Sequence, residues 1–405
     1  MATIIPFKGV RYSYNGRVPL EKIEPIFPYD FGSGEYWGKK IKSKNLTALM
    51  TKRDLIDRNY GISKKIYDAC LKHGILMIDS EPSFYVEIQN IPLNGGVDRV
   101  GLVGLLDIEE YNNGIIKPHE RTKPDVVKDR LELLKQANVN LEMGLYLYGT
   151  SGNYLNHSLS EHIKDKEPSM SYKDEIGVHH DFYRITDEDL IKKIQDFFDS
   201  QKIIIADGNH RTRVNSLFHT MRKSPTSRYF LACLADMSDK GVIIGGIERA
   251  TNIEAEKLLE IANRNFEIEI VKSKEEMDKL INGGSNEYIF GGLINEKYCI
   301  FSPLNNIADP PSDRLVDGLS VSVLHNYILN PAGVNENNIT FPIGDDEVDE
   351  AIKEGFKNIF FPRRVTKDEF GKIINNEEIF SKKTTGFKGK VPSGLVFYDH
   401  NLPLN

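Results

Sequence analysis

Hydrophobic and polar positions follow two different periods along the chain. "FYVEIQ" (84–89) and "RVGLVGLLDI" (99–108) are rich in apolar and β-branched residues, and the second is almost continuously apolar, as in a buried strand. "PDVVKDRLELLKQA" (124–137) instead spaces its apolar residues by three or four after an initial proline. This pattern predicts two strands followed by a helix.

A further helix, strand and helix are predicted near the middle of the chain. Thr186 followed by Asp189 resembles a capping box at the start of a helix with one apolar face. The apolar run from Ile203 to Ile205 predicts the next strand. The helix after it has apolar residues at i, i+3, i+4 and i+7, namely Val214, Leu217, Phe218 and Met221.

The C-terminal part continues the alternation of helices and strands. Its helical patterns lie around 254–264, 274–282, 347–356 and 367–375. Its strand patterns lie around 266–271, 287–303 and 358–361. We expect exposed loops at the polar segment 161–175 and at the proline-containing segment 302–314. The whole pattern predicts an α/β fold, or an α+β fold, with mixed sheets covered by helices.

Length and charge narrow the class of protein. One domain usually has roughly 100–200 residues, so the 405-residue chain is expected to form two regions, 1–250 with the candidate chemistry and 251–405. The formal net charge is −7 and no run of Lys and Arg offsets it, which argues against nucleic acid as a partner. A small anionic ligand is compatible with this net charge, because a few local Arg residues suffice to bind one.

Cysteine usage and hydropathy indicate the compartment. Cys70, Cys233 and Cys299 are widely separated and form no CxxC pair, which favours a reducing environment. The N-terminal residues lack the pattern of a signal peptide, and no segment approaches the roughly 18 apolar residues of a membrane span. We therefore expect a cytoplasmic protein without membrane contact, and the oligomeric state stays open.

The stretch "KIIIADGNHRTRVNSLFHTM" (202–221) contains the strongest candidate chemistry. Asp207 precedes the predicted helix, where a carboxylate can cap free N–H groups, and Gly208 allows a sharp turn. His210 and Arg211 continue the apolar face of the helix, so they point inward or into a cleft. An Arg and a His at one helix start favour an anion site, although an Asp cap beside a salt-bridged Arg is also a common structural arrangement.

The same stretch resembles the "ADGHHR" core of the domain-of-unknown-function family 1015, which reads "ADGNHR" here. Further blocks resemble that family in the same order, namely "PFKGVRY" (6–12), "PYD" (28–30), "PHERTKPDVVKDRLELL" (118–134) and "KKTTGFKGKVPSGLVF" (382–397). Asp-Gly-x-His-Arg after a strand also resembles the active segment of the ParB/sulfiredoxin-like superfamily. That superfamily includes nucleotide-dependent partition proteins and free-serine kinases, so the resemblance implies a ParB/sulfiredoxin-like core with a phosphate-handling site.

The resemblance implies a set of site residues. The implied catalytic residues are Asp207, His210, Arg211, Glu120 and His119, and the implied ligand or phosphate contacts are Gly208, Asn209, Arg249, Lys383 and Lys390. Two histidines of the family pattern are missing, because Asn209 replaces the first one and Glu248 replaces the histidine of a Pro-Thr-His-Arg segment. Thr212 and Arg213 also depart from the pattern, which has an aromatic residue and an acid there. These departures indicate either a shifted substrate or a lost activity.

The other candidates each have a structural alternative. His119 and Glu120 can supply acid–base chemistry, or Glu120 can bind magnesium, but "HER" also fits an exposed charged loop. Arg130 is expected to be solvated or salt-bridged. His179 and His180 are neighbours on a predicted strand, so they point to opposite faces and are not expected to share a metal. The sequence contains no recognisable zinc-ligand spacing.

The sequence also lacks a GxxxxGK[ST] loop and a protein-kinase signature set, and "GTSGNY" (149–154) is expected to be a plain loop. A nucleotide would therefore bind at a helix N-terminus with Arg211 and with Lys383 or Lys390. We expect an enzyme that transfers or hydrolyses a nucleotide phosphate, using ATP or ADP with Mg²⁺ and a small hydroxyl-bearing substrate such as serine. The alternatives are a ParB-like nucleotide-binding switch and a divergent member without catalysis. Loss of the Arg211 side chain is expected to reduce turnover far more than stability.

Overall fold

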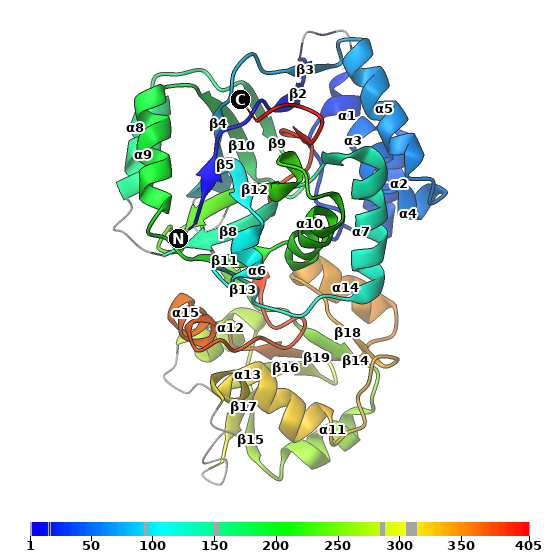
Figure 1. Cartoon of the computed structure of the whole chain (residues 1–405). Helices are drawn as coiled ribbons and strands as arrows, with labels where there is room; N and C mark the ends of the chain where they lie inside the picture. Colours follow the sequence, from blue (N-terminus) through cyan, green and yellow to red (C-terminus); the bar gives the residue numbers. More distant parts are fainter. Residues whose placement is uncertain are drawn as a thin grey trace. The chain divides into compact units, whose positions relative to one another are not determined.

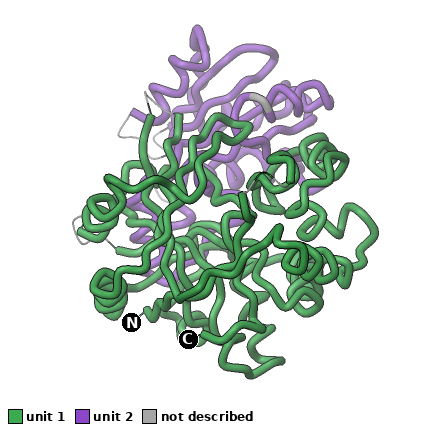
Figure 2. The backbone as a smooth tube through the Cα atoms, turned by 90° about the horizontal axis from the view of Figure 1, so that it is seen from above, with its two compact units in different colours: residues 1–243, 389–405 green, residues 244–388 purple. Residues whose placement is uncertain are grey.

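The computed structural model describes residues 2–14, 16, 18–92, 96–149, 154–283, 288–304 and 314–404. The chain forms two compact units, which Figure 2 colours separately. Unit 1 comprises Met1–Ile243 and Gly389–Asn405, and unit 2 comprises Ile244–Lys388. This division differs from the expected regions 1–250 and 251–405, because the C-terminal segment belongs to the same unit as the N-terminal region.

A nine-stranded mixed sheet forms the centre of unit 1. Its order is β6-β11-β8-β12-β5-β4-β10-β9, and β1 also pairs with β5. The β11–β6 and β12–β8 pairs are parallel, and the other pairs are antiparallel. The strands are β1 (Ile4–Ile5), β4 (Phe84–Ile91), β5 (Val97–Asp107), β6 (Ile116–Lys117), β8 (Gly144–Tyr148), β9 (Met170–Lys173), β10 (His179–Ile185), β11 (Ile203–Asp207) and β12 (Tyr229–Asp236).

Helices cover both faces of this sheet (Figure 1). On one side, α8 (Tyr154–Ile163) and α9 (Glu188–Phe198) bury their apolar faces in the main core of the sheet. On the other side, α7 (Pro124–Ala137) and α10 (Asn209–Arg222) pack against each other through Val127, Leu134, Val214 and Phe218. The unit is therefore a layered α/β structure with α10 leading directly out of β11.

Unit 1 contains further helices and short strands outside the central sheet. The helices are α1 (Leu20–Ile23), α2 (Gly34–Lys42), α3 (Leu46–Thr51), α4 (Arg53–Ile56), α5 (Gly61–Lys72), α6 (Glu109–Asn112) and the 3-10 turn η1 (Thr226–Arg228). The strands are β2 (Val10–Tyr12), β3 (Leu76–Ile78), β7 (Val139–Asn140) and β21 (Tyr398–Asp399). Because β21 pairs with β7 and Phe397 bridges Val10, the C-terminal segment is held within unit 1.

Unit 2 contains a six-stranded antiparallel sheet in the order β15-β17-β16-β19-β14-β18 and the separate pair β13–β20. Its strands are β13 (Ile244–Gly245), β14 (Arg249–Thr251), β15 (Phe266–Ile270), β16 (Phe290–Ile294), β17 (Lys297–Pro303), β18 (Ile339–Thr340), β19 (Asn358–Pro362) and β20 (Gly386–Phe387). Its helices are α11 (Ala255–Ala262), α12 (Lys274–Gly283), α13 (Ser320–Leu324), α14 (Asp345–Lys353), α15 (Lys367–Asn375), the 3-10 turn η2 (Leu315–Gly318) and the π-helical turn η3 (His325–Leu329).

The predicted mixed α/β architecture is confirmed, and the helix predicted at 124–137 is α7 with the same bounds. The predicted helix start at Thr186 is wrong by one residue, because the Asp187 carboxylate accepts the capping hydrogen bond from the Leu190 N–H. The segment 161–175 is not entirely a loop, since β9 lies within it. Most of the loops expected at 149–154 and 302–314 lies outside the described residues.

Candidate functional site

The junction between β11 and α10 is a tight turn at Gly208. This residue has φ = 109°, in the left-handed region that disfavours L side chains. A Cβ atom built on Gly208 would lie 3.1 Å from Gly144 Cα and 3.3 Å from Arg211 Nε. Gly208 is the N-cap of α10, so the predicted capping by Asp207 is wrong. The turn leaves the Asp207 carboxylate available for other partners.

The Asp207 carboxylate forms two ion pairs. Its Oδ1 accepts a hydrogen bond from Arg211 Nη2 at 3.0 Å, and its Oδ2 accepts one from Lys390 Nζ at 3.0 Å. Burial alone would raise the pKa of Asp207, but Lys390 and Arg211 outweigh it and hold that pKa well below its usual range. Asp207 is therefore ionised at neutral pH and fixes the positions of two cations.

Arg211 is buried and only partly satisfied. Its Nη1 donates to the Met143 carbonyl at 2.7 Å and its Nη2 to Asp207. Its Nε is buried and has no hydrogen-bond partner among the described residues. Burial disfavours the charge of Arg211, but Asp207 and Asp30 outweigh this effect and raise its pKa. An inward-pointing Arg211 was predicted, and the structure places it there with one donor unused.

His119 lies beneath the turn and is fully buried. Its Nδ1 is 2.5 Å from the Ile205 carbonyl oxygen, which can only accept, so Nδ1 carries the proton. Burial lowers the pKa of His119 to about 4, so the ring is neutral at pH 7. The Asn209 amide also contacts Nδ1, at 3.1 Å. One polar end of the buried Asn209 amide has no partner among the described residues.

His210 and Glu120 lie on the outer side of this cluster. The His210 Nε2 accepts a hydrogen bond from the Lys123 backbone N–H at 2.9 Å, at the start of α7. Burial lowers the pKa of His210, and nearby Glu120 and Asp30 oppose that shift. The His210 ring therefore joins α10 to α7 as a neutral acceptor, and this contact removes Nε2 from the phosphate-binding role expected for it.

The first turn of α10 offers unsatisfied donors beside the ion pairs. The backbone N–H groups of Asn209, His210 and Arg211 have no acceptor in the part of the chain that the structure describes. With the Arg211 Nε and the ammonium group of Lys390, they form a cluster of donors at a helix N-terminus, where negative charge is stabilised. This arrangement can bind the oxygens of a phosphate group, and Glu120 supplies a carboxylate near it.

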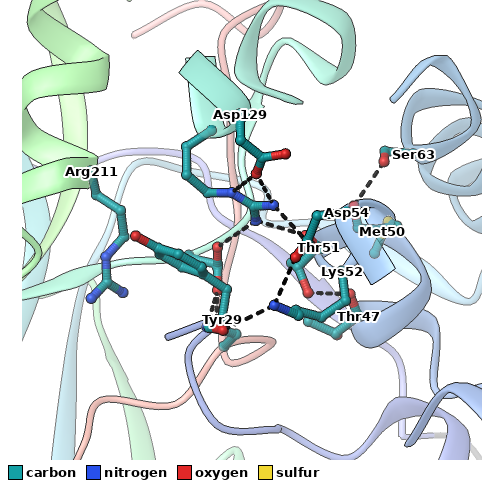
Figure 3. A network of polar contacts seen from close by, with 12 residues as sticks. Tyr29, Thr47, Met50, Thr51, Lys52, Asp54, Ser63, Asp129 and Arg211 are labelled. Atoms are coloured by element: carbon teal, nitrogen blue, oxygen red, sulfur yellow. Dashed lines mark hydrogen bonds and ion pairs between the residues drawn. The ribbon is translucent and has the colours of Figure 1, made fainter. Parts of the chain in front are cut away.

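Sequence reasoning missed three residues next to this cluster. Asp30 lies close enough to raise the pKa of both Arg211 and Lys390. Tyr29 places its ring 5.8 Å from the Arg211 guanidinium, and Figure 3 shows the two side chains side by side. The Tyr29 N–H donates to Glu142 at 2.8 Å, and burial raises the pKa of Glu142. Tyr29 and Asp30 lie in the block "PYD" (28–30), whose resemblance to the family was the available sequence signal for them.

Arg130 belongs to a neighbouring buried network. Its guanidinium lies 4.6 Å from the Tyr29 ring centroid, and it forms ion pairs with Asp129 at 2.5 Å and Asp54 at 3.2 Å. Figure 3 shows Asp129, Asp54 and Tyr29 in this network. Arg130 is salt-bridged and buried, which confirms the salt-bridged alternative of the two that were expected. The network holds Tyr29 next to Arg211 and so stabilises the position of the Arg211 side chain.

Two predicted phosphate contacts belong to unit 2. Arg249 lies on β14 and is almost completely buried, at 1% exposure. Lys383 is exposed and has φ = 61°. Glu248, which replaces a family histidine, is largely buried, and burial raises its pKa. These residues therefore belong to unit 2 and are no part of the β11–α10 cluster, and of the three only Arg249 lines the cavity of unit 2.

The histidine pair lies on β10 in unit 1. His179 is exposed and His180 is buried, which confirms that they point to opposite faces. The His180 ring lies between the carboxylates of Glu87 at 2.9 Å and Asp174 at 3.3 Å. Burial lowers the pKa of His180, but the hydrogen bonds to Asp174 and Glu87 outweigh it and raise that pKa. This buried ion-paired histidine is part of the sheet core.

Neither a metal-ligand cluster nor a membrane-spanning helix is present in the residues that the structure describes. No group of three or more His, Cys, Asp or Glu side chains in those residues is arranged to hold a metal ion. No helix in the same residues is long and apolar enough to cross a bilayer. Glu120 is thus no part of a preformed metal cage, although Mg²⁺ commonly binds through one or two carboxylates together with substrate phosphates.

The fold and the site define a two-unit α/β protein with a cluster of hydrogen-bond donors at a strand–helix junction. The chain belongs to the family described as "Protein of unknown function (DUF1015)", whose model matches residues 4–318. This membership confirms the resemblance found in the sequence. No curated protein matches the chain.

Several solved structures are similar to the chain at low identity. A conserved hypothetical protein from Pyrococcus furiosus has 15% identity and a TM-score of 0.35, covering 72% of this chain and 94% of its own. A free serine kinase in complex with AMP has 14% identity and a TM-score of 0.35, covering 72% and 91%. A C-terminally truncated SbnI from Staphylococcus aureus has 6% identity and a TM-score of 0.38, covering 72% and 85%. At these TM-scores we draw no functional conclusion from the similarities.

Proposed function

We propose that the β11–α10 junction transfers the phosphoryl group of a nucleotide to the hydroxyl group of a small metabolite. The observation that carries this proposal is the position of Asp207 between Arg211 and Lys390, beside a helix start with open N–H groups. A carboxylate in this position holds two cations ready for a ligand with several negative oxygens. The acidic balance of the chain and its expected cytoplasmic location are consistent with a small-molecule substrate.

The residues of the site have separate roles in this proposal. The first-turn N–H groups of α10 and the Arg211 Nε bind phosphate oxygens, and Lys390 offsets the charge that develops on the transferred group. Asp207 orients Arg211 and Lys390. It is a weak base, because its pKa lies below the usual range. Glu120 is therefore the better acceptor for the proton of the attacking hydroxyl group.

The proposed reaction replaces one phosphorus–oxygen bond by another. The hydroxyl oxygen of the substrate forms a bond to the terminal phosphorus, the bond from that phosphorus to the bridging oxygen breaks, and the shortened nucleotide leaves. The hydroxyl proton passes to Glu120. Glu120 would hold Mg²⁺ together with the phosphates, and the ion would supply positive charge that offsets theirs. The residues present fit such a ligand, because a buried Arg211 donor and one end of the Asn209 amide have no partner among the described residues.

A second function is favoured by one observation. Asp207 holds two cations in position to bind an anion, but its lowered pKa makes Asp207 itself a poor base. This is compatible with a nucleotide-binding switch that changes its contacts without turnover, or with a divergent member without catalysis. Turnover distinguishes these functions from the kinase.

The test is phosphorus NMR on the purified chain with Mg²⁺, ATP, ADP or CTP, and a pool of small hydroxyl compounds. Serine is included because of the sequence resemblance to a superfamily with free-serine kinases. We expect a new phosphomonoester resonance that Asp207→Asn abolishes and Asp165→Asn leaves unchanged, since Asp165 is an exposed residue. Unchanged nucleotide in every sample would contradict phosphoryl transfer, and nucleotide binding without turnover would support the switch.

A further inference from the structure

Unit 2 contains a cavity of about 270 Å³ beside the π-helical turn η3. Its charged lining residues are Arg249, Lys382 and Asp317, and His325 also lines it. π-Helical turns are rare and occur often at functional sites, because they displace side chains from the regular helical positions. The cavity therefore has two basic side chains, one carboxylate and a histidine on a distorted helix.

Arg249 is buried at the wall of this cavity without a carboxylate partner. Its Nη1 donates to the Ile247 carbonyl and its Nε donates to His325 Nε2 at 3.2 Å. Its guanidinium lies 5.3 Å from the centroid of the Phe341 ring, which also lines the cavity. Within the described residues Arg249 forms no ion pair. A buried guanidinium of this kind is costly unless an anion compensates its charge.

The surroundings of Arg249 do not supply that anion. Burial lowers the pKa of Arg249 to about 9, and Glu248 is the carboxylate that opposes this shift. Burial in turn raises the pKa of Glu248. The carboxylate of Asp317 also lines the cavity, so its charged lining consists of two basic side chains and one carboxylate.

His325 adds a neutral polar group to the lining. Because its Nε2 accepts from Arg249, its proton is on Nδ1. Burial and the neighbouring Arg249 lower the pKa of His325 to about 4, so it stays neutral at pH 7. Asn326 and Asn330, from the same part of the chain, offer exposed amide groups to the cavity. These groups can donate hydrogen bonds to an oxyanion without adding charge.

We propose that this cavity binds the oxyanion of a small metabolite, a phosphate or a carboxylate, between Arg249 and Lys382. A guanidinium presents two parallel N–H donors to such a group, and the ammonium of Lys382 adds a second charge. Drug-sized ligands usually occupy roughly 300–1,000 Å³, so a cavity of about 270 Å³ fits a small one. This site is independent of the phosphoryl transfer proposed for unit 1, because its contacts all come from unit 2.

The chain offers a matched pair of lysines for the test. Lys382 lines the cavity, whereas its exposed neighbour Lys383 does not. Isothermal titration calorimetry of the full chain is carried out with inorganic phosphate and, separately, with acetate. We expect saturable binding of one of these anions that weakens about tenfold in Lys382→Ala and changes less than twofold in Lys383→Ala. The anion that binds more tightly identifies the oxyanion.

Two further variants make the result decisive. Asn326→Ala removes an exposed donor and is expected to weaken binding about threefold, with the fold checked by circular dichroism. Lys390→Ala removes a cation from the unit 1 cluster, and the binding that depends on Lys382 is expected to persist in it. No saturable heat with either anion, or heat that disappears in Lys390→Ala but not in Lys382→Ala, would overturn the proposal.

Discussion

Lys390 Nζ lies 3.0 Å from Asp207 Oδ2, although 183 residues separate the two in the sequence. The C-terminal segment reaches Asp207 because it returns to unit 1, where β21 pairs with β7. The site is therefore built from both ends of the chain around the β11–α10 junction. Four predictions on stability and a final one on turnover follow from this arrangement.

The acid dependence of stability is expected to report the Asp207 ion pairs. The folded pKa of Asp207 lies below its unfolded value of about 3.9. The ion pairs therefore stabilise the fold above that value, and this stability is lost as the pH falls through the folded pKa. Urea unfolding of wild type and Asp207→Asn is expected to differ most above pH 4 and to converge below it. A constant difference across this range would contradict the assignment.

His119 is expected to make the free energy of unfolding depend on pH over a higher pH range than Asp207 does. Its folded pKa of about 4 lies below the unfolded value of about 6.5, so the unfolded state binds more protons between these values. The free energy of unfolding should rise with pH across this window, by roughly 3 kcal/mol in all. His119→Gln, which does not titrate, should remove this contribution and leave the similar one of His325, whereas the exposed His157→Gln should keep both. Equal slopes for wild type and His119→Gln would contradict the buried neutral ring.

Gly208→Ala is expected to destabilise the junction. The new Cβ would occupy left-handed backbone, at a cost of about 1–2 kcal/mol, and would press on Arg211 Nε. Gly38→Ala is the matched control, because Gly38 lies within α2 and a Cβ there meets nothing within 4 Å. That substitution should stabilise the protein by roughly 0.5–1 kcal/mol, as expected when Ala replaces Gly in a helix. Thermal unfolding measures both, and equal effects would refute the strained turn.

Arg211→Ala is expected to affect stability as well as turnover. The sequence predicted a far larger effect on turnover than on stability, but Arg211 pairs with a buried Asp207 and donates to the Met143 carbonyl, so a substantial loss of stability is expected too. Removing one partner of a buried ion pair costs about 3–5 kcal/mol, because the other charge is left without compensation. Arg213→Ala is the control, since Arg213 lies on the exposed side of α10. Chemical denaturation compares the two, and a loss below about 1 kcal/mol for Arg211→Ala would contradict the observed contacts.

The helical and strand periods predicted the local structure well. The bounds of α7 and the position of β11 before α10 follow directly from the spacing of apolar residues. The inward position of Arg211 also followed from its spacing to Val214 and Phe218 on one helix face. These features depend on residues within a few helical turns, so the sequence pattern contains them.

The spacing of apolar residues along the chain does not predict contacts between distant segments. The role of Asp30 and Glu142 near Arg211 depends on how the segment before α2 folds against α7, and no local period reports that. Lys390 was selected by resemblance together with Lys383, but only the structure shows that the two belong to different units. The capping role of Asp207 was wrong because Gly208 is the N-cap and the Asp207 carboxylate pairs with Arg211 and Lys390.

Phosphoryl transfer at the β11–α10 junction is tested most directly by the transfer rate of Lys390→Met. Phosphorus NMR measures this rate at saturating nucleotide. Lys390 is argued to stabilise charge on the transferred phosphoryl group, so its loss should reduce the rate by about 100-fold or more. Lys128→Met, at an exposed position on α7, is the control and should transfer at the wild-type rate. A folded Lys390→Met variant with an unchanged transfer rate would contradict the account.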